Sequence, residues 1–312
     1  MKRLLIPALC VLALAACTGK QNKNGDAAKN ADTESVAGNV GTESAANGES
    51  SQNAGNNPVF LLGNKDGSKF LLKATSEVAA NNAPDYLKNY KYILYEGKYY
   101  DVDFKGLQEG DKDADTGRDT PYNYDNCRGW YFEMHSGKLL TNPQSEYDVF
   151  WGTPLLVDEK FKNETKLLDV KNFDVDDAPV DVSKEKAKFE KQYGKKAIKF
   201  KLDATFGDYN YYVMQFETIE NKALGAIAIV KSDGTTITKD FPCEWNELST
   251  WREGDEGEFY GYDILFATIE KGNLNIYTYN GGEEGASYQN YVVQGNTLAE
   301  GVVSNYFYFA AE

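Results

Sequence analysis

Short segments in which apolar and polar residues alternate recur along the chain from residue 58 onward. In residues 101–104 and 198–202, each apolar side chain is followed by a charged one. A period of two is typical of half-buried β-strands. Tight-turn pairs such as Asp66-Gly67 and Asp233-Gly234 separate many of these segments, and Asp-Gly between apolar runs favours a hairpin turn. The pattern therefore predicts antiparallel β-hairpins.

The predicted hairpins share one layout, in which two strands rich in apolar residues flank a tight turn. They cover residues 59–72, 90–104, 130–140, 223–238, 260–279 and 288–309, with further strands at 198–202 and 209–219. Strands at this spacing predict a mainly β fold of antiparallel sheets, arranged as a sandwich, a barrel or a partial propeller.

One or two short helices are expected beside the sheets, and one of them has defined ends. Ser183 is placed to cap residues 184–193, and Gly194 is placed to end them. The polar stretch 174–179 before this helix is typical of a linker. The predicted organisation is therefore one β-rich domain over 58–160, a linker with the helix over 161–195, and a second β-rich domain over 196–312.

The start of the chain has a different pattern. Lys2 and Arg3 precede an apolar run over residues 4–13, and small residues follow it. This order is typical of a secretory signal. The run is too short to span a bilayer, which needs roughly 20 apolar residues. We therefore expect residues 1–16 to be a signal peptide.

The residues at the end of this run, Leu14-Ala15-Ala16-Cys17, resemble the lipobox of bacterial lipoproteins. The resemblance covers only the first 20 or so residues. It implies that the Cys17 thiol receives a diacylglyceryl group, that the signal is cut just before Cys17, and that the new terminus is acylated with a fatty acid such as palmitate. Several acyl chains hold a protein stably at a membrane, whereas one does not. Thr18 in place of Asp favours the outer membrane of the cell envelope.

Residues 18–57 are almost entirely small or polar, without an aromatic side chain. Such a segment buries too little apolar surface to offset its ordering entropy, so it is expected to be a disordered tether. A flexible chain of this length has a root-mean-square span of about 35 Å. Residues 17–57, which begin with the lipidated Cys17, are thus predicted to hold the folded part of the chain away from the membrane.

Charge and cysteine usage narrow the classes of partner. The formal net charge is −15, which disfavours nucleic acid because phosphate contacts need Lys and Arg. A basic partner or a cation such as Ca²⁺ is compatible with this charge.

Outside the cytoplasm, Cys127 and Cys243 are candidates for a disulfide, and two separately buried thiols are the alternative.

Few residues suggest catalysis. His135 is the chain's one histidine and stands beside a predicted turn, where an exposed imidazole needs no special role.

Asp111, Asp113 and Asp115 alternate as in the start of an oxygen-ligand calcium loop. The match to an EF-hand fails, since Thr116 stands at the glycine position and Tyr122 at the bidentate Glu position. The alternative interpretation is a solvated acidic loop.

Tyrosines two residues apart are the remaining candidate site, because such pairs point to one face of a strand. An exposed tyrosine face is a common binding surface for sugars or proteins, and cross-strand packing within a sheet is the alternative. The candidate ligand-binding aromatics are Tyr209, Tyr211, Tyr260, Tyr262, Tyr277 and Tyr279.

The sequence therefore predicts a membrane-anchored envelope lipoprotein with a non-catalytic body that binds a glycan, a protein or an envelope component. One alternative is a carboxylate-dependent glycan hydrolase, because paired acids can cleave glycosides. Another is an acidic inhibitor or capture protein for a cationic enzyme, because the chain is strongly negative.

Overall fold

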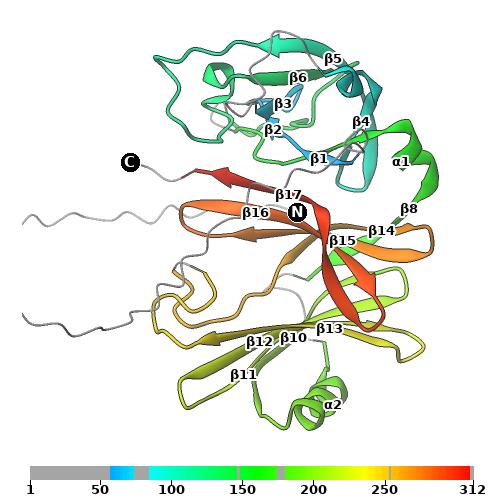
Figure 1. Ribbon diagram of the computed structural model, residues 1–312, viewed down its shortest axis with the longest axis vertical. Helices are drawn as coiled ribbons and strands as arrows, with labels where there is room; N and C mark the ends of the chain where they lie inside the picture. Colours follow the sequence, from blue (N-terminus) through cyan, green and yellow to red (C-terminus); the bar gives the residue numbers. More distant parts are fainter. Residues whose placement is uncertain (1–56, 74–83, 146–147, 174–179, 253, 310–312) are drawn as a thin grey trace, which may run out of the picture. The chain divides into compact units, whose positions relative to one another are not determined.

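The computed structural model describes residues 57–73, 84–145, 148–173, 180–252 and 254–309. The predicted signal peptide, the lipidation site Cys17, the tether up to residue 56 and the linker stretch 174–179 lie outside these residues. The described residues all belong to one compact unit. They are mainly β, as the sequence pattern predicts (Figure 1). The predicted boundary between two β-rich domains stays a prediction.

Within the described residues, one sheet contains seven strands in the order β1-β7-β4-β5-β6-β3-β2, and it is called the first sheet below. Its strands are β1 (Val59–Phe60), β2 (Leu62–Gly63), β3 (Lys69–Lys73), β4 (Tyr90–Tyr95), β5 (Lys98–Gln108), β6 (Gly129–Met134) and β7 (Leu155–Asp158). Two short 3₁₀ helices accompany it, η1 (Asp85–Asn89) and η2 (Tyr124–Asn126). The described pairings in this sheet are antiparallel.

Three hairpins were expected in the first sheet, with different outcomes. The β4–β5 hairpin is confirmed, and its turn residues Glu96 and Gly97 both have positive φ. In the 59–72 hairpin, β2 pairs with β3, but β1 leaves to pair with β7. The prediction of a hairpin over residues 130–140 is wrong. Both edges of β6 are already paired, with β3 and β5, so Leu139 instead donates its N–H to the Gly67 carbonyl in a loop.

The other described strands form the second sheet, in the order β8-β14-β15-β16-β17-β13-β12-β11-β10-β9. Its strands are β8 (Thr165–Leu168), β9 (Val170–Asn172), β10 (Ala197–Phe206), β11 (Tyr209–Ile219), β12 (Lys222–Lys231), β13 (Thr236–Glu244), β14 (Asp263–Glu270), β15 (Asn273–Gly281), β16 (Gly285–Gln294) and β17 (Thr297–Tyr308). The predicted turns at 233–234, 271–273 and 295–296 each join antiparallel neighbours. The β13–β17 pairing is parallel and short.

A short segment brings the two ends of the second sheet together. β8 pairs with β14 at one end, and β9, which follows at once in the chain, pairs with β10 at the other. The Asn172 side chain on β9 also donates to the Ile264 carbonyl on β14. The second sheet therefore nearly closes into a barrel, and residues that were expected to be linker supply two of its strands.

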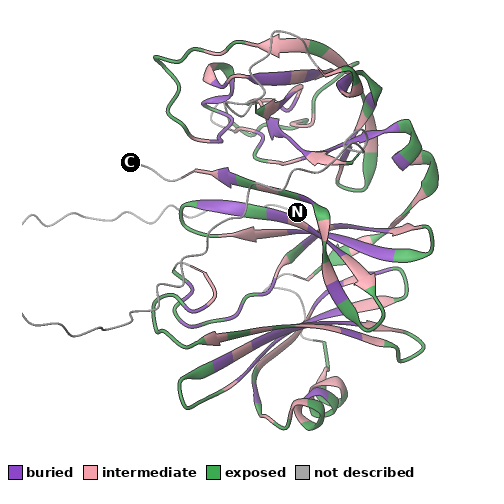
Figure 2. Cartoon of the chain, viewed as in Figure 1, coloured by how far each residue is buried: buried purple, intermediate pink, exposed green. Residues whose placement is uncertain are grey.

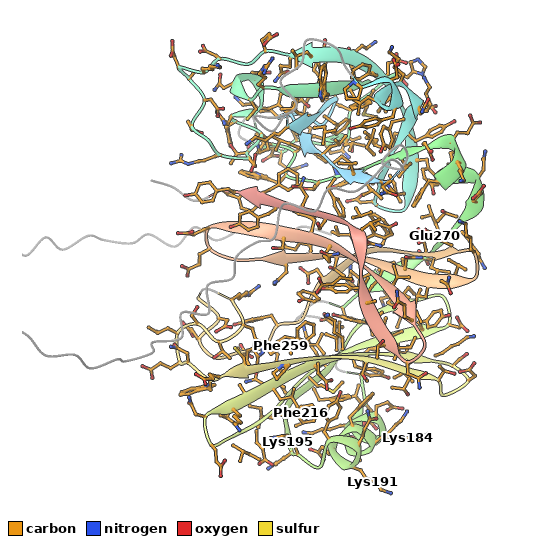
Figure 3. The ribbon with its side chains drawn as sticks, in the orientation of Figure 1. Lys184, Lys191, Lys195, Phe216, Phe259 and Glu270 are labelled. Atoms are coloured by element: carbon orange, nitrogen blue, oxygen red, sulfur yellow. The ribbon has the colours of Figure 1, made fainter. Side chains whose placement is uncertain are left out.

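The helices are α1 (Glu159–Glu164) and α2 (Ser183–Tyr193) among the described residues. Gly194 ends α2 in the left-handed conformation, as predicted. The predicted Ser183 cap is wrong, because Ser183 is itself the first helical residue and donates its N–H to Asp181. Phe189 fixes α2 to the second sheet through contacts with Phe200 and Tyr212, below the strands in Figure 3.

The buried residues form clusters that connect the elements (Figure 2). One cluster fills the inside of the second sheet and draws on strands all around it, with Phe206, Ile227, Ile276 and Leu298 among its members. Another joins the two sheets, because Phe60 on β1 contacts Tyr277 and Tyr288. These contacts fix the two sheets against each other.

Candidate functional site

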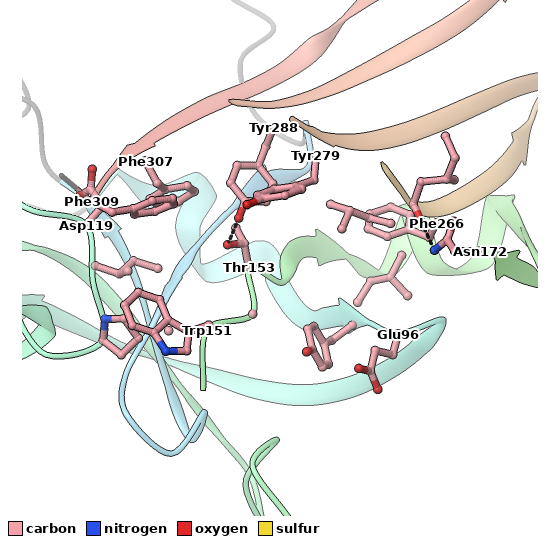
Figure 4. A pocket seen from close by; sticks show the side chains of 18 residues that line it. Glu96, Asp119, Trp151, Thr153, Asn172, Phe266, Tyr279, Tyr288, Phe307 and Phe309 are labelled. Atoms are coloured by element: carbon pink, nitrogen blue, oxygen red, sulfur yellow. Dashed lines mark hydrogen bonds between the residues drawn. The ribbon is translucent and has the colours of Figure 1, made fainter. Parts of the chain in front are cut away.

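A cleft of about 570 Å³ lies where the first and second sheets meet. Figure 4 shows Trp151 and Glu96, from loops of the first sheet, on one side, and Tyr279, Tyr288 and Phe307, from the second sheet, on the other. Its size falls within the range of small-molecule sites. The remaining lining residues are Leu62, Gly63, Leu94, Tyr95, Asp119, Pro121, Gly152, Thr153, Asn172, Ile264, Leu265, Phe266 and Phe309.

Trp151 projects into this cleft because its neighbours in the loop are fixed. The preceding Phe150 is buried against Phe70 and Tyr95. At the following Gly152, a Cβ would lie 2.5 Å from ring atoms of Phe150 and Tyr95, so only glycine fits there. With its neighbours packed on the core, the Trp151 indole is left 56% exposed.

A second exposed aromatic stands beside Trp151. The Tyr122 ring is 54% exposed and its centroid lies 6.1 Å from that of Trp151, at an interplanar angle of 62°. The Lys65 ammonium lies 5.1 Å from the Tyr122 ring centroid. Two large aromatics exposed side by side can mark a binding surface. Trp151 lines the cleft and Tyr122 stands next to Trp151, so the two form an aromatic rim beside the cleft.

The opposite wall is also aromatic but buried. Tyr288 packs against Tyr279 and Phe307, with ring centroids 5.3 Å apart in each case. The Thr153 hydroxyl donates to the Tyr288 hydroxyl at 2.8 Å, which connects the two sheets across the cleft. Burial raises the pKa of Tyr288 to about 12. This wall is therefore uncharged at neutral pH and presents rings with a few hydroxyl groups.

Two carboxylates line the cleft, and they are not equivalent. Asp119 is buried and forms an ion pair with Lys73 at 2.6 Å, and it accepts the Tyr308 N–H at 3.0 Å. Its oxygens are thus committed within the protein. Glu96 stands exposed in the β4–β5 turn. Burial and then the neighbouring Glu96 carboxylate raise the pKa of Tyr95 to about 12. Glu96 is therefore the cleft carboxylate that a ligand reaches more easily.

The tyrosine pairs do not form the expected exposed face. Tyr211 and Tyr277 are buried, Tyr209 stacks on Phe206, and Tyr262 stacks on Tyr291. The spacing of two does place paired residues on one face, but that face is largely the core. Tyr279 lines the cleft, and Tyr260 is 40% exposed in a neighbouring pocket. The other four of these tyrosines pack within the second sheet.

The proposed disulfide is not formed, because Cys127 and Cys243 are both free. The Cys243 thiol donates to the Thr250 carbonyl at 3.0 Å. Cys127 is buried in the cluster between the sheets, where Asn123 donates to its sulfur at 3.3 Å. Burial raises the pKa of the Cys127 thiol to about 11. The two thiols have separate partners, but the alternative of two separately buried thiols holds only for Cys127, because Cys243 is half-buried.

The calcium candidate is also corrected. Asp111 accepts the N–H of Asp113, and Asp115 accepts from the Gly117 N–H and from the Asn123 amide. These carboxylates stabilise local turns instead of converging on one point. Across the described part of the chain, no cluster of three or more His, Cys, Asp or Glu side chains is arranged to hold a metal ion.

His135 lies on the surface, with its side chain 64% exposed and Nε2 3.3 Å from an Asp103 oxygen. It is not among the residues that line the cleft.

Among the described residues, the helices are too short or too polar to span a membrane.

Sequence reasoning missed Tyr122 and Trp151, the two residues that define the rim. Both lie in loops, where no strand period marks them. The available signal was a large aromatic next to Pro121 and another between Phe150 and Gly152. Large aromatics in polar or glycine-containing loops are candidates for exposed binding residues.

In comparisons with known proteins, no family model, no curated protein and no solved structure matches the chain.

Proposed function

We propose that this protein is a lipid-anchored lipoprotein of the bacterial outer membrane, with a non-catalytic body that binds a glycan in the cleft between its two sheets. The observation that carries the proposal is the pair of exposed aromatics, Tyr122 and Trp151, at the rim of an aromatic cleft. Sugar rings have apolar C–H faces that pack on flat aromatic rings, while their hydroxyls need a few polar partners.

The polar groups of the cleft fit this ligand class. Glu96 offers a carboxylate acceptor, and the Thr153 and Tyr288 hydroxyls are hydrogen-bonded to each other across the space. A few such groups among many rings are typical of small-molecule sites, in which polar contacts set orientation. The lipobox-like residues before Cys17 support the anchor, and the polar tether supports presentation of the cleft away from the membrane.

Binding is favoured over hydrolysis by the state of the cleft carboxylates. A glycosidase of the usual kind needs two carboxyl groups that face the scissile bond. Asp119 is paired with Lys73 and with the Tyr308 N–H, which leaves Glu96 as the accessible acid. A non-catalytic module is therefore the function that this geometry supports best.

The test uses the full chain extracted from membranes with detergent. Mass spectrometry of its first residue is expected to find acylated Cys17. The same preparation, applied to a glycan array, is expected to bind a defined set of oligosaccharides. Replacement of Trp151 by Ala is expected to weaken that binding by about tenfold to a hundredfold, since truncation of an aromatic residue that dominates a binding surface costs roughly 2 kcal/mol.

The matched control is Trp245→Ala, which removes another exposed tryptophan that lies outside the cleft. It is expected to leave binding unchanged. An array without any bound glycan, or equal losses in the two variants, would contradict glycan binding in this cleft. An unmodified first residue other than Cys17 would contradict the anchor.

A further inference from the structure

A second pocket of about 310 Å³ adjoins the cleft, and Tyr279 lines both. Its other lining residues come from strands of the second sheet, from the loop before β14 and from the turn after β15, with Lys201, Arg252, Tyr260 and Asp263 among them. Tyr279 borders both spaces, so the pocket lies next to the cleft. The pocket is named the arginine pocket below.

The charge of the arginine pocket differs from that of the rest of the chain. Lys201 and Arg252 line it together with one carboxylate, Asp263, whereas the chain as a whole has 48 acidic and 33 basic residues. Lys201 is held by Asp203, which lies at 2.5 Å and is itself almost buried. Arg252 is thus the cation of this pocket that a ligand could bind.

Arg252 is held in place by an aromatic ring and a backbone carbonyl. Its guanidinium carbon lies 4.4 Å from the centroid of the Tyr260 ring, and Nη1 donates to the Gly281 carbonyl. Within the described residues, no Asp or Glu forms an ion pair with it. A guanidinium has five N–H donors in a planar fork, so most of its donor capacity remains for a ligand.

The backbone N–H of Arg252 donates to a buried carboxylate, which helps to preorganise the side chain. Asp255 is fully buried and accepts the N–H groups of Thr250, Trp251, Arg252 and Gly257. Tyr260 is held in turn between two cations, because Lys199 lies 4.3 Å from its centroid and also pairs with Glu258 at 2.8 Å. An arginine fixed on an aromatic ring loses little freedom when it binds a planar anion.

We infer that the arginine pocket is a subsite for a carboxylate group of the glycan, so that the ligand of this protein is an acidic saccharide. Arg252 would bind the carboxylate through two parallel N–H···O hydrogen bonds, a geometry that matches guanidinium to carboxylate. The neutral sugar rings would lie in the cleft against Trp151 and Tyr279. This inference rests on the proposed function, and it adds the charge of the ligand.

The test compares two forms of one saccharide, an oligosaccharide of neutral sugars with a single uronic acid at one end and the same oligosaccharide with that carboxyl group methyl-esterified. The full chain in detergent is expected to bind the acid about tenfold more tightly than the ester, a difference that corresponds to about 1.4 kcal/mol. Added salt is expected to reduce this preference, since the interaction is electrostatic. Arg252→Ala is expected to bind both forms with the affinity of the ester, and Arg252→Lys to keep part of the preference.

Arg128→Ala is the matched control, because Arg128 pairs with Glu109 and lies outside both spaces. It is expected to keep the full preference for the acid. Equal binding of acid and ester by the unchanged chain, or a preference that survives in Arg252→Ala, would overturn the inference while leaving glycan binding intact. Absence of binding to every glycan would instead contradict the proposed function.

Discussion

The two sheets differ in how far apart along the chain their paired strands lie. In the second sheet, β10 to β13 and β14 to β17 pair as consecutive antiparallel neighbours. In the first sheet, Val59 pairs with Leu156, and β3 pairs with β6 although β4 and β5 lie between them in the chain. Distant pairing costs more loop entropy before it gains contacts. The first sheet therefore depends on long-range packing, while the second is built from local turns.

Both candidate subsites draw on long connections between strands. The long connections of the first sheet contain Tyr122 and Trp151, which have no strand partners. In the second sheet, the long connection between β13 and β14 carries Arg252 and Tyr260. Long loops on a rigid sheet are the usual place for binding residues, and both candidate subsites follow this rule.

The largest expected effect concerns the dependence of the two sheets on each other. Phe60 is 1% exposed and packs from the first sheet against Tyr277 and Tyr288 of the second. Phe60→Ala is expected to lower the free energy of unfolding by about 3–5 kcal/mol, the usual range for a buried Phe. Urea denaturation followed by far-ultraviolet circular dichroism and by tryptophan fluorescence measures it.

Both probes are expected to shift together, since Phe60 connects the sheets. Separate transitions in the variant would show that one sheet is stable without the other. Ile198→Ala is the control, because that side chain is 58% exposed. Its effect is expected within about 0.5 kcal/mol.

The next effect concerns the long loop of the first sheet. Gly110 has a φ of +70°, and a Cβ there would overlap the Asn126 carbonyl oxygen and the backbone of Cys127. Gly110→Ala is expected to cost about 2–4 kcal/mol, since both the positive φ and the backbone clash are unfavourable. Gly117 has a φ of +74° with nothing within 4 Å of its Cβ position.

Gly117→Ala therefore separates the two causes. It retains the cost of the positive φ alone, about 1–2 kcal/mol. Thermal unfolding of the two variants side by side measures the difference. Equal shifts in midpoint would mean that the close approach of residues 110 and 126 does not hold this loop.

The smallest of the three effects concerns the arginine-bearing loop of the second sheet, which relies on one carboxylate. Burial raises the pKa of Asp255, but hydrogen bonds from four backbone N–H groups outweigh it and leave that pKa below its usual value. Asp255→Asn is expected to cost about 1.5–3 kcal/mol, typical of hydrogen bonds to a charged group. Chemical denaturation at pH 7 measures this difference.

The sign of its pH dependence follows from the lowered pKa. A carboxyl whose pKa is depressed by folding stabilises the protein above its unfolded pKa, near 3.9, and loses that contribution as the pH falls through the folded value. The gap between the unchanged chain and Asp255→Asn is therefore expected to be constant from about pH 6 to 8 and to close below pH 4. A gap that stays constant at lower pH would contradict the charge-based account.

Much of the fold follows from the sequence by itself. The turns at Asp233-Gly234, Lys271-Gly272 and Gly295-Asn296 predicted hairpins that are present, because a tight turn is a local property of a few residues. Helix α2 and its end at Gly194 were predicted for the same reason. The anchor at Cys17 also comes from the sequence alone, and it stays a prediction.

Only the tertiary structure decided which side chains are exposed. The spacing of two correctly places Tyr277 and Tyr279 on one face of β15, yet Tyr277 is buried and Tyr279 lines the cleft. The cleft combines loops and strands from two sheets, and Arg252 faces its pocket because Asp255 holds the surrounding backbone. Alternation along a strand is a local consequence of backbone geometry. Burial and the meeting of distant loops depend on long-range packing, which a period in the sequence does not encode.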